Sequence, residues 1–109
     1  MSEQKNKGPA KHYLELTASF PEVLAAVEKL GETVRSAGPV DHKTSELIQL
    51  AAAAATQSTG SVRSHARKAL QAGAGKEEIE HSLLLLISTI GFPQVAAALS
   101  WVKDILDDA

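Results

Sequence analysis

Apolar side chains recur along this chain at intervals of three and four residues, and no stretch alternates apolar and polar residues at intervals of two. This spacing places apolar residues on one face of a helix, and it is typical of a helix with one buried side. Alanine, which is abundant here, favours helix and lets neighbouring helix axes approach closely. We therefore expect an all-α fold. The clearest repeat is Phe20, Val23, Leu24, Val27, Leu30 and Val34.

Start and stop signals divide the chain into about five helices, which we expect to form a compact bundle. The first helix is predicted to begin near Ser19, with Ser19 and Glu22 as a capping box and Pro21 in the first turn. It is predicted to stop at Ser36-Ala37-Gly38-Pro39, with Gly38 as a left-handed cap. The other four are expected from Asp41 to Ala55, from about Ser61 to Gln71 with a stop at Gly73, from Gly75 through Ile87, and from the Gly91–Pro93 turn through Leu106. Acidic residues at the very end are expected to fray the last helix.

The length of 109 residues is that of one domain, expected over residues 13–109 after a flexible polar tail over residues 1–12. A formal charge of −2 argues against a nucleic-acid partner, and Arg63, Arg67 and Lys68 are interpreted as the solvated stripe of a helix. The absence of cysteine excludes disulfides and thiol chemistry. No signal-peptide pattern is seen, so we expect a cytoplasmic protein without a membrane partner.

The run from Leu83 to Ile87 is apolar on every side of a helix and is far too short to span a bilayer. Such a helix belongs in the centre of a bundle or at a subunit interface. The same applies to Trp101 on the last helix. A monomer of this size would have difficulty covering these residues, so a homo-oligomer is expected.

The best candidate for chemistry is a histidine that a carboxylate can reach from the preceding helix. If the helices that carry Glu46 and His65 pack antiparallel, the carboxylate can orient the imidazole and raise its basicity. Ser58 and Ser61 precede His65 by seven and four residues, on the same helix face. They are interpreted first as helix caps, and alternatively as a nucleophile that His65 activates.

Two further histidines stand at spacings that a metal site could use. His81 follows Glu78 by three residues and Glu77 by four, and His42 precedes Glu46 by four. A di-iron bundle needs the Glu-x-x-His motif twice, and a second copy is absent. We therefore expect no metal and no cofactor.

The order of these motifs resembles the carboxymuconolactone decarboxylase and alkylhydroperoxidase D-like family. Its members carry a glutamate, a Cys-x-x-Cys pair and a histidine four residues later. Here Glu46, Ser58-Thr59-Gly60-Ser61 and His65 keep that spacing with both thiols replaced by serine. The segments Ala72–Ile79 and Ile90–Pro93 are also similar to the family, and the likeness extends over about residues 20–106.

The resemblance implies an all-α fold that self-associates as a dimer, trimer or hexamer, and it offers two chemistries. One is thiol peroxidase activity, which serine cannot support because it does not cycle through a disulfide. It returns as a hypothesis only if serines 58 and 61 replace natural cysteines. The other is decarboxylation of a γ-lactone acid, a lyase reaction that does not need the cysteines. We thus expect a protein that acts on or binds a small organic acid or lactone through Glu46 and His65. The alternative is a non-catalytic oligomeric scaffold or ligand-binding protein.

Overall fold

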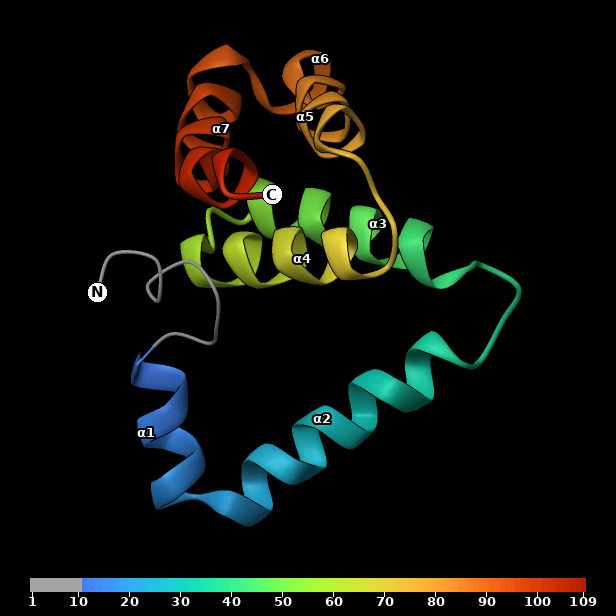
Figure 1. The fold of residues 1–109 in the computed structure, drawn as a ribbon, viewed down its shortest axis with the longest axis vertical. Coiled ribbons are helices and arrows are strands. Elements are labelled where there is room, and N and C mark those ends of the chain that lie inside the picture. The colour runs from blue at the N-terminus through green and yellow to red at the C-terminus, as the bar shows by residue number, and fades with distance from the viewer. Residues whose placement is uncertain (1–10) are drawn as a thin grey trace. The chain divides into compact units, whose positions relative to one another are not determined.

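The computed structural model describes residues 11–109, and over this range it contains seven helices and no strand (Figure 1). The all-α prediction is confirmed, but the predicted number of about five helices is too low. The two additional helices are short: one precedes the first predicted helix, and the other lies between the fourth and the fifth. Most of the predicted N-terminal tail lies outside the described residues. The chain divides into two units between Asp41 and His42. The expected single domain over residues 13–109 spans both units and stays a prediction.

The first unit contains α1 (Lys11–Ser19) and α2 (Pro21–Arg35), and the hydroxyl of Tyr13 donates a hydrogen bond to the carboxylate of Glu28 across the pair. That bond also raises the pKa of Tyr13 above its ordinary value. Neither helix has a buried residue. The apolar repeat of α2 is therefore a largely exposed stripe, in which Phe20, Val23, Val27, Leu30 and Val34 keep 56–62% of their surface exposed.

The predicted caps at both ends of α2 are wrong, although the helix stops where expected. Ser19 is the last residue of α1 and Phe20 occupies the N-cap of α2 without a side-chain cap, so the predicted Ser19–Glu22 capping box is wrong. Proline disfavours helical geometry in the residue before it, which places the break at Phe20. Gly38 is not left-handed either. The C-cap is Ser36, the first residue of the predicted stop, and the backbone N–H and hydroxyl of Ser36 both donate to the Glu32 carbonyl.

The second unit is built on a helical hairpin of α3 (His42–Ala55) and α4 (Thr59–Gln71), with short connections to the helices that follow. Alanine dominates the contact between α3 and α4, because Ala53, Ala54, Ala66 and Ala69 are all at most 7% exposed. Side chains this small allow the two helices to lie close together. Gly73, with φ of 101°, ends α4 as predicted, and the Ala74 N–H donates to the Ala69 carbonyl.

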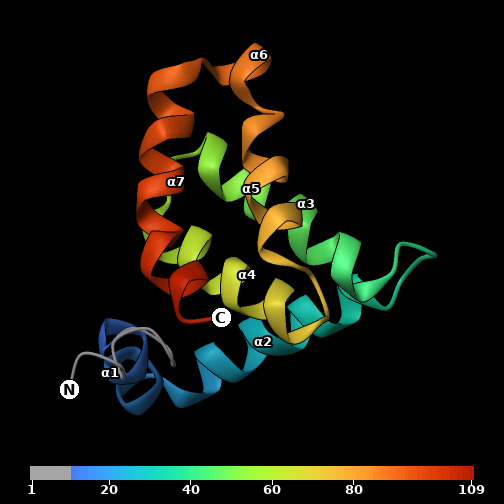
Figure 2. The ribbon, with the colours of Figure 1, turned by 45° about the horizontal axis from the view of Figure 1, so that its top comes forward.

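The remaining helices are α5 (Lys76–Leu84), α6 (Ile87–Ile90) and α7 (Phe92–Asp107). Figure 2 shows α5 and α7 running beside each other, with α6 joining them at one end. The start of α5 is as predicted, since the Gly75 N–H donates to Glu78 Oε1 at 2.9 Å. At the start of α7 the predicted turn is confirmed, with Gly91 at φ of 93° before Pro93.

The Leu83–Ile87 run does not form one continuous helix. The Leu86 N–H donates to the Leu83 carbonyl, a three-residue spacing that tightens the last turn and ends α5. Leu83 is fully buried, whereas Leu84, Leu85 and Ile87 keep 38–62% of their surface exposed. A central position in the bundle is therefore wrong for most of this run.

The core of the second unit joins α3, α4, α5 and α7 around fully buried aliphatic side chains. Its members are Leu50, Ala53, Ala54, Val62, Ala66, Ala69, Ala74, Ile79, Leu83, Ala98, Val102 and Leu106. Trp101 packs against this core, as one of its two interpretations expected.

Among the helices of residues 11–109, none has the length and apolar character that crossing a membrane requires.

Candidate functional site

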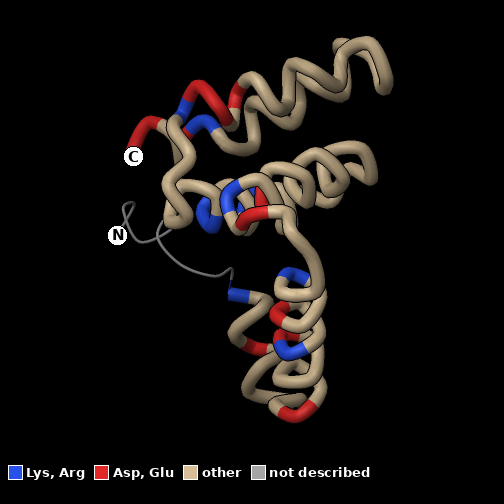
Figure 3. Tube along the Cα trace, turned by 90° about the vertical axis from the view of Figure 1, so that its right-hand side faces the viewer, with Lys and Arg blue, Asp and Glu red and all other residues tan. Residues whose placement is uncertain are grey.

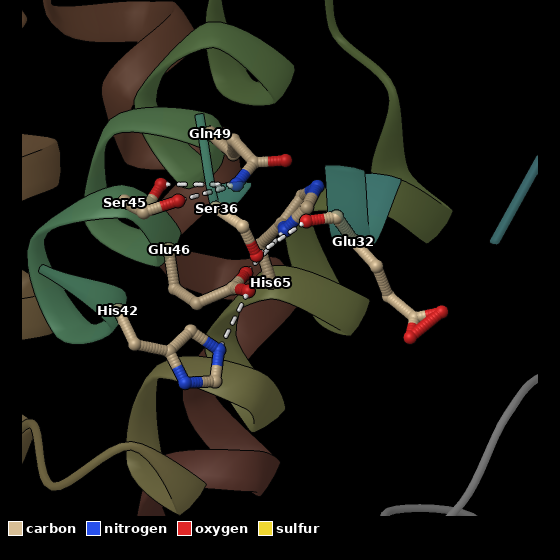
Figure 4. Close-up of polar contacts among 7 residues, drawn as sticks. All are labelled: Glu32, Ser36, His42, Ser45, Glu46, Gln49 and His65. Carbon is tan, nitrogen blue, oxygen red and sulfur yellow. Dashed lines mark hydrogen bonds and ion pairs between the residues drawn. The ribbon is translucent and has the colours of Figure 1, made fainter. Parts of the chain in front are cut away.

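Glu46 and His65 form a hydrogen-bonded pair at the centre of the α3–α4 hairpin (Figure 4). Glu46 Oε1 lies 2.8 Å from His65 Nδ1. The Glu46 side chain is fully buried, and the His65 side chain keeps 18% of its surface exposed. The two side chains therefore approach each other as predicted. Glu46 is shielded from solvent, whereas His65 reaches the surface.

The helix faces explain why the two side chains meet. Glu46 shares the buried face of α3 with Leu50, Ala53 and Ala54, at the three- and four-residue spacing of one helix side. His65 lies between the buried Val62 and Ala66 on α4. A carboxylate is costly to bury unless hydrogen bonds compensate it. The imidazole of His65 supplies one such bond.

A second imidazole lies against the other oxygen of the same carboxylate. His42 Nε2 is 3.3 Å from Glu46 Oε2, and the His42 side chain is 63% exposed. The two residues are one turn apart on α3, so helix geometry itself brings them together. The i, i+4 spacing was visible in the sequence, but it was weighed there only as a metal-binding pattern.

No group of three or more His, Cys, Asp or Glu residues in the described part of the chain is arranged to hold a metal ion. Glu78, which the sequence paired with His81, instead accepts from the Gly75 N–H and from Lys43 Nζ at 3.0 Å. The Gly75 bond first and the Lys43 bond second lower the pKa of the Glu78 carboxyl. His81 is exposed on α5.

Neither of the two serines at the family's thiol positions forms a side-chain hydrogen bond with His65. Ser58 occupies the N-cap position of α4, but its side chain makes no capping hydrogen bond. Ser61 lies in the first turn of α4 and is exposed. Ser58 thus occupies the capping position that the sequence suggested, but its hydroxyl does not cap the helix. No hydrogen bond joins the Ser61 hydroxyl to His65, so the structure shows no activated serine.

One of the three basic residues of α4, Arg63, joins α4 to the last helix. Arg63 donates to Asp104 Oδ1 and Oδ2 and to the Trp101 carbonyl on α7. Burial, followed by the positive charge of Arg63, lowers the pKa of Arg67. The solvated-stripe interpretation is therefore wrong for Arg63. The last helix, α7, extends to Asp107, and the fraying expected at its acidic end stays a prediction.

A shallow hollow of about 260 Å³ lies on α5 and α7. Its lining is Glu80, Leu99, Ser100, Lys103, Leu106 and Asp107, and neither Glu46 nor His65 contributes to it. This hollow therefore lies away from the Glu46–His65 pair.

The chain was compared with protein-family models, curated proteins and solved structures. No curated protein and no solved structure matches it. The model of the carboxymuconolactone decarboxylase family matches residues 21–104, a span that contains Glu46, both serines and His65. With most of its length covered by this match, the chain belongs to the carboxymuconolactone decarboxylase family.

Proposed function

We propose that this protein acts on a small organic acid or lactone, with His65 as the acid–base group and Glu46 as the residue that orients it. The observation that carries this proposal is the 2.8 Å contact between Glu46 Oε1 and His65 Nδ1. With Glu46 Oε1 as the acceptor, the Nδ1–H of His65 donates the hydrogen bond, which leaves Nε2 as the nitrogen that takes up or releases a proton. The partial exposure of His65 gives a ligand access to the ring.

This arrangement suits a decarboxylation in simple chemical terms. When a carboxylate leaves as carbon dioxide, the electron pair of the broken carbon–carbon bond stays on the substrate and has to receive a proton. A protonated His65 would supply that proton from Nε2, and the buried Glu46 carboxylate would stabilise the positive imidazole. Neither serine has a role in this reaction, which fits the absence of a hydrogen bond from either hydroxyl to His65.

The test is a thermal-shift screen of lactones and dicarboxylic acids, followed by an assay for carbon dioxide release from each compound that binds. We expect a hit to raise the melting temperature of the native protein and of Ser61→Ala, and to be turned over by both. His65→Gln should lose turnover, while the matched variant His81→Gln on α5 should keep it. Equal turnover by His65→Gln would overturn the proposal, and loss in Ser61→Ala would point to a serine nucleophile instead.

A second candidate function is a non-catalytic oligomeric scaffold or ligand-binding protein. The observation that favours it is an uncharged surface where α5, α6 and α7 join. No Lys, Arg, Asp or Glu occurs from His81 to Val102, and Figure 3 shows this stretch without charge colours. Leu84, Leu85, Ile87 and Phe92 are exposed there by 38–62%. Contiguous apolar surface of this kind marks interaction sites. If no compound in the screen is turned over, this candidate replaces the first.

A further inference from the structure

The side-chain amide of Gln49 on α3 has a fixed orientation. Its Nε2 donates to Ser45 Oγ at 3.0 Å and to the Ser45 backbone carbonyl at 3.2 Å. A backbone carbonyl can only accept a hydrogen bond, so the amide nitrogen has to lie on this side and the amide oxygen on the other. Figure 4 shows the nitrogen of Gln49 turned toward Ser45 and Oε1 turned away from it.

The oxygen end of this amide is open to a donor. Gln49 Oε1 accepts no hydrogen bond from residues 11–109, and it does not belong to the buried polar atoms of this range, so it reaches solvent. An amide oxygen has two lone pairs for hydrogen bonds. Gln49 therefore presents a fixed acceptor at the surface of α3.

This acceptor lies beside the Glu46–His65 pair. Gln49 follows Glu46 by three residues, and side chains at this spacing are neighbours on a helix. Because α3 and α4 run antiparallel, the turn of α3 after Glu46 lies opposite the turn of α4 before His65. Gln49 and His65 are both partly buried. The amide oxygen and the imidazole thus border the same stretch of the hairpin surface.

The two groups select different parts of a ligand. A protonated His65 donates from Nε2 to a carboxylate, whereas Gln49 Oε1 needs a donor such as a hydroxyl. The Gln49 amide offers no donor in return, since both hydrogen bonds of its Nε2 go to Ser45. A ligand that satisfies both groups carries a hydroxyl close to a carboxylate.

We propose that Gln49 sets the substrate specificity of the Glu46–His65 centre by accepting a hydrogen bond from the hydroxyl of a small hydroxy acid. Ser45 is the positioning residue that keeps Gln49 Oε1 turned toward the ligand. This inference rests on the proposed function and narrows its substrate class. A site with a fixed acceptor disfavours an analogue that lacks the donor, because the acceptor would lose water without gaining a partner.

The experiment is an NMR titration of the full ¹⁵N-labelled chain with malate, as either enantiomer, and with succinate, which lacks only the hydroxyl. The ring signals of His65 report binding at the site. We expect one enantiomer of malate to bind about five- to tenfold more tightly than succinate. Gln49→Met, similar in length but without the acceptor, should bind both acids with the native affinity for succinate. Gln71→Leu, at the exposed end of α4, is the matched control and should keep the preference for malate.

Binding of neither acid, or equal binding of both, by the native protein would overturn the proposal. A Gln49→Met protein that keeps the preference would also overturn it, as would one that binds both acids more weakly in the same proportion, which is the result of a purely structural role. Ser45→Ala lets the amide turn and should reduce the preference, and an unchanged preference would remove the positioning role of Ser45. Failure of the proposed function is distinguishable, because a Gln49-dependent preference without carbon dioxide release would support the specificity role and remove the catalytic one.

Discussion

Two guanidinium nitrogens of Arg63 on α4 donate hydrogen bonds to the carboxylate of Asp104 on α7, to Oδ1 at 2.8 Å and to Oδ2 at 3.1 Å. The same Arg63 side chain also donates to the Trp101 carbonyl at 2.6 Å. These bonds tie the helix that carries His65 to the last helix of the chain. The site hairpin is thereby anchored on the face of α4 that does not carry the Glu46–His65 pair.

The Arg63–Asp104 contact predicts an acid-sensitive contribution to stability. The hydrogen bond from Arg63 first, and its charge as well, hold the pKa of Asp104 below the ordinary value of 3.8. A carboxyl whose folded pKa is lowered stabilises the fold above its unfolded pKa, and that contribution disappears as the pH falls through the folded pKa. Stability should therefore decline below about pH 4 in part through Asp104.

Urea unfolding of Arg63→Gln and Asp104→Asn tests this contribution. We expect a loss of about 1 kcal/mol at pH 7 in each, because the pair is partly exposed and solvent weakens it. This loss of unfolding free energy should shrink toward zero as the pH falls below the pKa of Asp104 in the folded protein. Lys103→Gln, which breaks the exposed Lys103–Asp107 pair, serves as the control and should change stability by only a few tenths of a kcal/mol. A pH-independent loss in Asp104→Asn would contradict the assignment.

Burial differs sharply between neighbouring positions of α5. We therefore expect substitutions three residues apart to lower the free energy of unfolding by very different amounts. Leu83 has no exposed surface, so Leu83→Ala should destabilise the protein by roughly 2–5 kcal/mol through lost burial and the cavity left behind. Glu80→Ala, on the exposed face of the same helix, should lie within about 0.5 kcal/mol of native. Chemical unfolding followed by circular dichroism measures both. Similar stabilities of the two variants would contradict the position of Leu83 in the core.

Local signals in the sequence were sufficient where a single residue type decides the backbone. Gly73 and Gly91 are left-handed at the predicted helix boundaries, and Gly75 begins a capping box with Glu78. The Glu46–His65 contact was predicted on the condition that the two helices pack antiparallel, and α3 and α4 meet that condition. These features depend on neighbours within a few residues, or on one pair of adjacent helices.

The errors lie where a distant partner or a competing local rule decides. The role of Arg63 depends on Asp104 and Trp101, which lie on another helix. Leu84 and Leu85 match the buried Leu83 in type, so no periodicity distinguishes the exposed leucines from the core one. Ser19 is a good cap by type, but Pro21 moves the helix break to Phe20.

The backbone at Gly91 predicts a position where alanine is not tolerated. Its φ of 93° is costly for any residue with a Cβ, although an added Cβ would meet only Pro93 Cδ, at an ordinary contact distance of 3.9 Å. Gly91→Ala should therefore destabilise the protein by about 1–2 kcal/mol. Gly60→Ala is the matched control, because Gly60 lies in the first turn of α4 with open space and ordinary helical backbone. It should be neutral or stabilising by up to about 1 kcal/mol, and a comparable loss in both would show that backbone strain is not the cause.

The uncharged surface at the α5–α6–α7 junction predicts that the chain self-associates. Leu84, Leu85, Ile87 and Phe92 expose apolar surface that a monomer would leave in water, and association would bury it. Light scattering of the native protein should then give a multiple of the 11.5 kDa chain mass. Leu85→Lys should return the mass to that of one chain, because a charge would have to be buried in the contact. Gln71→Lys adds the same charge at the exposed end of α4 and should leave the assembly intact. A Leu85→Lys protein that is folded by circular dichroism and keeps the native mass would place the contact elsewhere, with the exposed stripe of α2 as the next surface to test.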